Sequence, residues 1–267
     1  MHIEYGVISD IGRVRTSNED SYIVDVQNSL FLVADGMGGH AAGEVASRIA
    51  ADTVQEFISG SDRTINMETL LQLAVLEANS RVYQTQQATP EYRGMGSTLT
   101  VLAFQDDRYY LAQVGDSRAY LLRDKRLSQL SRDHSVVWPL YESGVLSKDN
   151  IRKHPQKNLV TRCIGTQLEV EAVQIFAHVQ SARRARQWNH PHLNREAKHD
   201  LRRSTTTLAG DSHQCRGLHF LTIRGQEGEP LVNNTARLTQ SAHIPIPAGS
   251  GIAAILNERG NDTAIRQ

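Results

Sequence analysis

An apolar run that ends on a carboxylate constrains this chain most. Residues 31–34 are Phe-Leu-Val-Ala, Asp35 follows, and a glycine-rich turn then leads to His40. Such a run predicts a buried strand that brings Asp35 to the edge of a sheet, while the glycines let the backbone approach a ligand. The Asp35 carboxylate and the Gly36 carbonyl are oxygen donors of the kind that suit Mg²⁺ or Mn²⁺. Taken alone, however, the stretch favours the plainer interpretation, a strand followed by a glycine-rich turn.

The composition excludes several classes of protein. Hydrophobic residues make up 39% of the 267 residues, which is enough for a core, and 29 basic residues balance 29 acidic ones. This balance gives no reason to expect nucleic acid or a membrane as the main partner. Cys163 and Cys215 are too few and too far apart for a disulfide framework. Without a signal-peptide pattern or a long apolar segment, we expect a soluble, cytoplasmic protein.

The order of predicted elements indicates an α+β fold. Strands are predicted over residues 4–10, 22–26 and 30–35, amphipathic helices over about 45–58 and 67–86, and a meander of strands over 98–104, 109–114 and 119–122. The two consecutive helices should pack on one face of a sheet. The second and third strands are adjacent along the chain, so we expect Glu19, Asp20 and Asp35 near one sheet edge.

Acidic residues at predicted strand ends and turns form the candidate site. They are Glu19, Asp20, Asp35 and Asp116, with Arg15 and His40 close to them in the sequence. Such an oxygen-rich site could hold two Mg²⁺ or Mn²⁺ ions, bridge them through one carboxylate and activate a water, which fits hydrolysis of a phosphate ester. Arg15 would bind the phosphate oxygens bidentately, and His40 would protonate the leaving alkoxide.

Each of these residues also has a plainer explanation. Arg15 could be a solvated surface arginine, Asp116 a turn residue, and His40 the start of a helix. Glu19 and Asp20 could belong to a charged loop. Each residue alone favours the plainer explanation, but the order of the motifs along the chain is much more specific than any one of them.

Five ordered motifs resemble those of the metal-dependent serine/threonine phosphatases of the protein phosphatase 2C type, in their short bacterial form. The motifs are RTSNED at 15–20, VADGMGGH at 33–40, GMGST at 94–98, VGDSRAY at 114–120 and DHS at 133–135. The resemblance implies a four-layer α-β-β-α sandwich of antiparallel sheets flanked by helices. It also implies phosphoserine and phosphothreonine hydrolysis in protein substrates, and a serine/threonine kinase as a functional partner.

The resemblance also implies roles for individual residues. Asp35 would bridge two Mn²⁺ or Mg²⁺ ions, the Gly36 carbonyl would bind one of them, and Glu19 and Asp20 would orient metal-bound waters. Arg15 matches the phosphate-binding arginine, His40 the general acid, and Asp116 the ligand of a third, weaker ion. Residues 136–158 would form a flap over the site.

The last third of the chain departs from this pattern. Residues 1–178 match a catalytic domain, whereas residues 179–267 form an Arg/His-rich segment in which we expect poor order and an incomplete fold. The family's later Asp-Gly and Asp-Asn metal-binding dipeptides do not occur after His178. We interpret the segment as the product of a shifted or replaced coding region, the alternative being a basic, poorly folded tail that contacts nucleic acid or membrane. The chain would then be an impaired phosphatase, or an inactive regulator that binds a phosphorylated partner or kinase.

Overall fold

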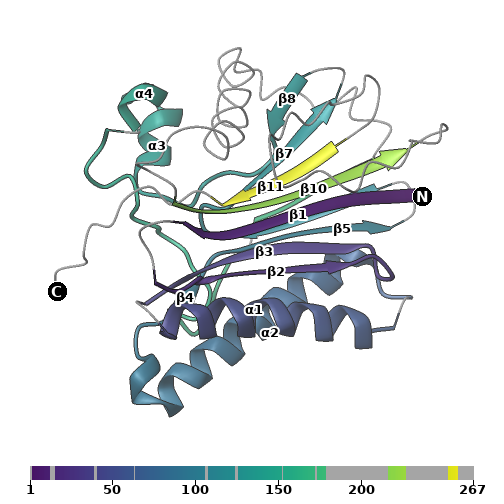
Figure 1. Ribbon diagram of the computed structural model, residues 1–267, viewed down its shortest axis with the longest axis horizontal. Coiled ribbons are helices and arrows are strands. Elements are labelled where there is room, and N and C mark those ends of the chain that lie inside the picture. The colour runs from purple at the N-terminus through teal and green to yellow at the C-terminus, as the bar shows by residue number, and fades with distance from the viewer. Residues whose placement is uncertain are drawn as a thin grey trace.

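Two antiparallel β-sheets lie face to face, and two long helices cover the outer face of one of them (Figure 1). The computed structural model describes residues 2–12, 16–38, 41–62, 64–105, 108–123, 126–151, 153–171, 173–178, 216–226 and 252–257. The described part is thus an α+β structure in three layers, helices, sheet and sheet. The fourth, helical layer of the expected sandwich stays a prediction.

The sheet next to the helices has six strands, in the order β2-β3-β5-β6-β9, with the short β4 paired to the end of β3. Its strands are β2 (Asp20–Asp25), β3 (Leu30–Met37), β4 (Gly96–Ser97), β5 (Leu99–Gln105), β6 (Arg108–Val114) and β9 (Val173–His178). The predicted strands in this sheet are confirmed, and β3 continues two residues beyond the predicted end at Asp35.

The interior strand β3 is buried on both faces, which explains its continuous apolar sequence. Leu30, Leu32 and Ala34 pack in the core beneath the helices, whereas Phe31 and Val33 belong to a second cluster that includes Val7 of the facing sheet. Side chains alternate between the faces of a strand, so Asp35 lies on the same face as Phe31 and Val33. The carboxylate is therefore placed at the end of the layer between the two sheets.

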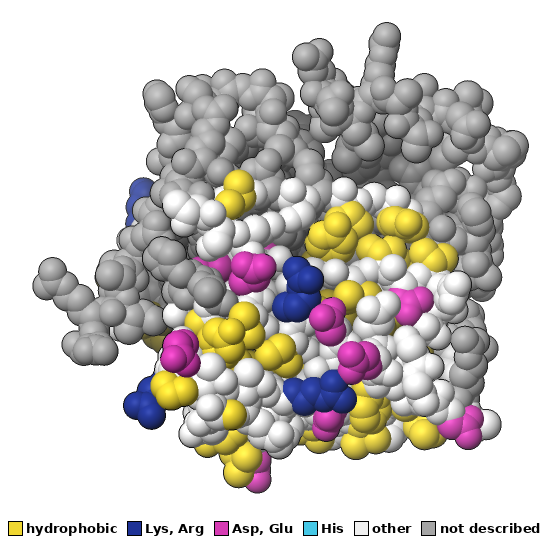
Figure 2. Space-filling model, turned by 60° about the horizontal axis from the view of Figure 1, so that its bottom comes forward, with side chains coloured by type: hydrophobic (Ala, Val, Ile, Leu, Met, Phe, Trp, Pro, Cys, Tyr) yellow, Lys and Arg dark blue, Asp and Glu magenta, His cyan; other side chains and the backbone are white. Residues whose placement is uncertain are grey.

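The helices are α1 (Ala41–Gly60) and α2 (Met67–Ala88), and a short 3₁₀ helix, η1 (Pro90–Tyr92), follows α2. Asn66 caps α2 by accepting a hydrogen bond from the Thr69 N–H at 2.8 Å. The outer face of the helices carries acidic and basic side chains among apolar ones (Figure 2). On this face Arg81 of α2 pairs with Glu56 of α1 at 2.7 Å and with Glu77 at 2.8 Å. None of the described helices is long and apolar enough to cross a membrane.

The second sheet has five strands, in the order β1-β10-β11-β7-β8. They are β1 (His2–Gly12), β7 (Arg118–Arg123), β8 (Arg126–Gln129), β10 (Arg216–Gln226) and β11 (Ile252–Asn257). Both β10 and β11 come from residues beyond 178 and lie between β1 and β7 in this sheet. That the fold is incomplete after about residue 178 stays a prediction. The poor order expected for the rest of 179–267 concerns residues outside the described ones.

The predicted flap is closed at its base by two backbone hydrogen bonds. The Val136 N–H donates to the Leu159 carbonyl at 3.0 Å, and the Thr161 N–H donates to the His134 carbonyl at 2.7 Å. Between these bonds the chain forms two short helices, α3 (Val137–Glu142) and α4 (Lys148–Ile151). Both helices lie at one end of the sheets (Figure 1).

Candidate functional site

The ends of β2 and β3 bring four of the predicted site residues together. Asp20 lies directly opposite Asp35 in the antiparallel register. The Gly36 N–H donates to the Glu19 carbonyl at 2.9 Å. Asp35 is only 1% exposed, and a buried carboxylate is costly unless it is hydrogen-bonded, paired or bound to a metal ion. The two strands thus place Asp35 opposite Asp20 and next to the backbone of Glu19, at the one sheet edge where the sequence predicted these acids.

Glycine is required where α1 begins against this strand pair. A Cβ on Gly36 would lie 1.9 Å from the Gly43 carbonyl oxygen and 2.6 Å from the Glu19 carbonyl oxygen. A Cβ on Gly43 would lie 3.1 Å from Cδ of Glu19. The first turn of α1 therefore touches the strand backbone next to the acids, and the glycines in the motif serve a close approach of two backbones.

Asp35 is held from the other side by residues between β4 and β5. The Thr98 N–H donates to the Asp35 carbonyl at 2.8 Å, and the Asp35 N–H donates to the Thr98 hydroxyl at 2.9 Å. The Ser97 hydroxyl also donates to the Asp35 carbonyl, at 3.1 Å. Every backbone polar group of Asp35 thus has a partner, so the residue has little freedom to move.

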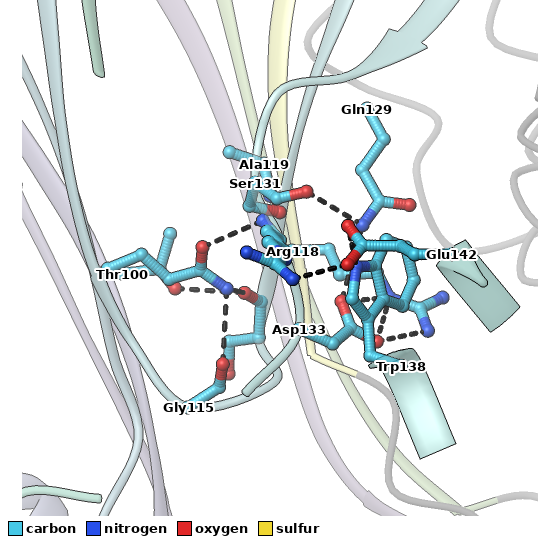
Figure 3. Close-up of polar contacts among 12 residues, drawn as sticks. Thr100, Gly115, Arg118, Ala119, Gln129, Ser131, Asp133, Trp138 and Glu142 are labelled. Carbon is cyan, nitrogen blue, oxygen red and sulfur yellow. Dashed lines mark hydrogen bonds and ion pairs between the residues drawn. The ribbon is translucent and has the colours of Figure 1, made fainter. Parts of the chain in front are cut away.

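Asp116 lies in the turn between β6 and β7, where Gly115 has a positive φ of 103°. The Gly115 N–H donates to Nδ1 of His134 at 3.1 Å, and the Gly115 carbonyl accepts a hydrogen bond from Nε2 of Gln113 at 3.1 Å. The Ser117 hydroxyl lies 2.7 Å from the Thr98 hydroxyl. Figure 3 shows part of this network around Gly115, together with Thr100, whose hydroxyl donates to the Ser117 carbonyl. The turn that carries Asp116 is therefore fixed on both sides.

Arg118, at the start of β7, forms an ion pair with Asp133 and contacts Trp138 of the predicted flap. Nε of Arg118 donates to both carboxylate oxygens of Asp133 at 2.9 Å, and the guanidinium lies 5.9 Å from the ring centroid of Trp138 on α3 (Figure 3). Nε1 of Trp138 in turn donates to Glu142 at 2.9 Å, and Arg132 also pairs with Glu142. Asp133 is nearly buried, so the pair is shielded from solvent.

Burial keeps His134 neutral. It lowers the pKa of the imidazole from 6.5 to about 4, and the positive charge of Arg162 acts in the same direction. Because Nδ1 accepts the Gly115 N–H, the proton of the neutral ring is on Nε2. The ring therefore acts as a fixed acceptor for the Asp116 turn.

Two predicted site residues, Arg15 and His40, lie outside the described residues. Sequence reasoning gave no role to Thr98, Ser117 or His134, although all three lie in the motifs that carry the resemblance. Their roles depend on contacts between segments far apart in the chain. The one signal that the sequence offered was a hydroxyl residue next to an acidic one, as where Ser117 follows Asp116.

The donor chemistry at these strand ends fits a hard divalent ion. Within the described ranges, no three His, Cys, Asp or Glu side chains gather closely enough to form a metal site alone. Magnesium sites commonly keep several waters and use only one or two carboxylates. Asp35, its acidic neighbours and the Gly36 carbonyl therefore provide the type of oxygen ligand that such a site needs.

Comparisons with known proteins agree with the sequence motifs. The profile of the family described as Protein phosphatase 2C matches residues 13–138. The chain is 36% identical over 177 residues to the serine/threonine phosphatase stp of Listeria monocytogenes, which covers 64% of this chain and 69% of that protein. It is 37% identical over 175 residues to the protein phosphatase PhpP of Streptococcus pneumoniae, covering 63% and 70%.

Solved structures are similar over a longer part of the chain. The Mycobacterium tuberculosis serine/threonine phosphatase PstP/Ppp has a TM-score of 0.63 at 26% identity, covering 96% of this chain and 98% of that one. The catalytic domain of PstP in complex with two manganese ions has a TM-score of 0.62 at 25% identity, covering 96% and 97%.

Proposed function

Because the chain belongs to the protein phosphatase 2C family of serine/threonine phosphatases, we propose that it hydrolyses phosphoserine and phosphothreonine in proteins. The observation that carries this proposal is the buried Asp35 carboxylate at the end of β3, opposite Asp20 and joined through Gly36 to Glu19. Its substrates would be phosphorylated proteins, and the kinase that phosphorylates them would be its functional partner.

The oxygen donors of the site would have different roles in binding metal ions and water. Asp35 and the Gly36 carbonyl would hold two Mn²⁺ or Mg²⁺ ions, Glu19 and Asp20 would orient waters, and Asp116 would hold a third ion. When bound, the ions supply a water of lowered pKa as the nucleophile. The similar PstP catalytic domain was solved in complex with two manganese ions, which supports a site for two such ions.

Two further side chains would handle the phosphoryl group. Arg15 would bind its oxygens bidentately, because a planar guanidinium matches two phosphate oxygens. His40 would donate a proton to the serine or threonine alkoxide as it leaves. No side chain of this chain would form a covalent intermediate.

The test is release of phosphate from a phosphothreonine peptide by the full chain. We expect release that requires Mn²⁺ and is stopped by EDTA. Asp35→Asn should lower kcat by at least about 100-fold, the upper end of the losses seen when only an outer-shell partner is removed.

Asp25→Asn is the matched control, because Asp25 lies at the opposite end of β2, where its carboxylate caps the turn at Asn28. It should keep nearly full activity. Equal rates for the Asp35→Asn variant and the unchanged chain would refute the role given to Asp35.

A second candidate function is that of a non-catalytic regulator. The observation in its favour is that neither an Asp-Gly nor an Asp-Asn dipeptide occurs after His178, so the matching metal ligands of the family are missing from the sequence. Such a protein would bind a phosphorylated partner or kinase through Arg15 without turning it over. A chain that binds the phosphopeptide but releases no phosphate would establish this alternative.

A further inference from the structure

A side-chain hydroxyl replaces a backbone carbonyl in the ladder beside Asp35. The register of β3 with β4 (Gly36 opposite Ser97) continues that of β3 with β5 (Val33 opposite Thr100), so Asp35 faces Thr98 at the break between β4 and β5. In a regular antiparallel pair the Asp35 N–H would donate to the Thr98 carbonyl. Here it donates to the Thr98 hydroxyl at 2.9 Å, and the Thr98 carbonyl accepts the Ser97 hydroxyl at 2.7 Å.

The same hydroxyl reaches the turn that carries Asp116. It lies 2.7 Å from the Ser117 hydroxyl, and Thr98 and Ser117 are both fully buried. Because the Thr98 oxygen accepts the Asp35 N–H, its own hydrogen is available to donate to Ser117. One hydroxyl group thus joins the backbone of Asp35 to the residue that follows Asp116.

The methyl group of Thr98 fixes the turn by packing. A Cβ placed on Gly115 would lie 2.6 Å from Cγ2 of Thr98, so the Gly115 backbone rests directly against this side chain. The rotamer of Thr98 is therefore fixed by both of its branches: the hydroxyl group forms hydrogen bonds, and the methyl group packs against Gly115. A serine could keep the hydrogen bonds, and a valine could keep the packing.

We propose that Thr98 is a positioning residue whose hydroxyl group sets Asp35 in place relative to Asp116. This inference rests on the proposed function, because Thr98 would act on the affinity for the metal ions that these carboxylates would hold. Groups that orient metal ligands affect affinity strongly, and their loss costs about 10–100-fold. Thr98 touches no substrate or ion itself.

Three variants distinguish the effect of losing the Thr98 hydroxyl from the effect of a general loss of stability. Thr98→Val removes the hydroxyl and keeps the shape, and Thr98→Ser keeps the hydroxyl. Thr100→Val is the matched control, because Thr100 is equally buried two residues along and its hydroxyl donates to the Ser117 carbonyl at 3.0 Å without touching Asp35. That carbonyl keeps a second donor, Nε2 of Gln113 at 3.1 Å.

The measurement is binding of Mn²⁺ to the full chain, followed by the electron paramagnetic resonance signal of the free ion, with thermal unfolding in EDTA alongside. We expect Thr98→Val to weaken Mn²⁺ binding by about tenfold or more. Thr98→Ser and Thr100→Val should bind within about twofold of the unchanged chain, even if both valine variants unfold at a similarly lower temperature.

The outcomes distinguish this inference from the proposed function. If the unchanged chain binds no Mn²⁺, or if Asp35→Asn binds it equally well, the proposed metal site fails and the inference fails with it. If Asp35→Asn loses binding but Thr98→Val binds as Thr100→Val does, the metal site stands and the positioning role is overturned. Weak binding by Thr98→Ser as well would also overturn it, because the hydroxyl would not be the group responsible.

Discussion

His134 shows how one buried side chain supports the candidate site without belonging to it. Its ring is 7% exposed and accepts the Gly115 N–H at 3.1 Å through Nδ1. A protonated ring could not accept this bond, so protonation would remove a support of the turn that carries Asp116. The charged groups that act on it are Arg162, Asp133, Arg132 and Glu171.

We expect stability to fall as the pH is lowered through the range in which His134 gains a proton. The pKa is about 4 in the folded chain against 6.5 in a free histidine, so the unfolded chain binds the proton first. The contribution of the neutral ring is complete above about pH 6.5 and is lost between there and about pH 4, a change on the order of 3 kcal/mol.

Urea unfolding at pH 7 and pH 5 measures this change. His134→Asn is the control, because the asparagine carbonyl can accept the Gly115 N–H but does not titrate in this range. The variant should lose less stability than the unchanged chain between these pH values. An equal loss in both would show that another group is responsible.

At the scale of elements, α2 holds the loop that returns from the flap to β9. The side chain of Asn79 accepts the Gly165 N–H at 2.8 Å and donates to the carbonyls of Gln167 and Leu168 at 3.0 Å each. Gly165 has a positive φ of 85° and lies directly against Val82 of the same helix. One buried amide thus fixes the path of a loop more than 80 residues later in the sequence.

Replacing Asn79 by leucine should therefore destabilise the chain by about 2–3 kcal/mol, because the buried Gly165 N–H would lose its acceptor. The free energy of unfolding in urea measures the effect. Gln84→Leu on the exposed side of α2 is the control, and a change within about 0.5 kcal/mol is expected. Similar values for the two variants would contradict the role assigned to Asn79.

Much of the sheet next to the helices could be predicted because local pattern determines it. Leu70, Leu71, Ala74, Ala78 and Val82 recur at helical spacing, and all are buried. The run through β3 is continuous because both of its faces are covered. The helices and β3 therefore followed from periodicity and apolar runs alone.

The contacts that complete the site could not be predicted in the same way. The hydrogen bond from the Asp35 N–H to the Thr98 hydroxyl joins residues 63 positions apart. The hydroxyl is the acceptor because strand pairing is interrupted between β4 and β5, and no sequence pattern predicts this interruption. His134 and Gly115 meet 19 positions apart for a similar reason. Motif order indicated which segments mattered, whereas tertiary contacts decided what each polar group does.

In the whole molecule, the C-terminal third contributes strands to the five-stranded sheet. β10 and β11 lie between β1 and β7, so residues beyond 178 supply the middle of one sheet. Their apolar runs, such as Ile252 to Leu256, lack the alternation that predicts a half-exposed strand, but a central strand can be apolar throughout. A catalyst and a non-catalytic regulator would share this architecture and differ in the metal ligands they can assemble.

A single-turnover experiment distinguishes these two functions most directly. The full chain, in excess over a phosphothreonine peptide and at saturating Mn²⁺, is mixed rapidly and the released phosphate is measured over time. We expect release of one phosphate per peptide, dependent on Mn²⁺ and abolished by Asp35→Asn. Binding of the peptide with no release at any Mn²⁺ concentration would contradict it.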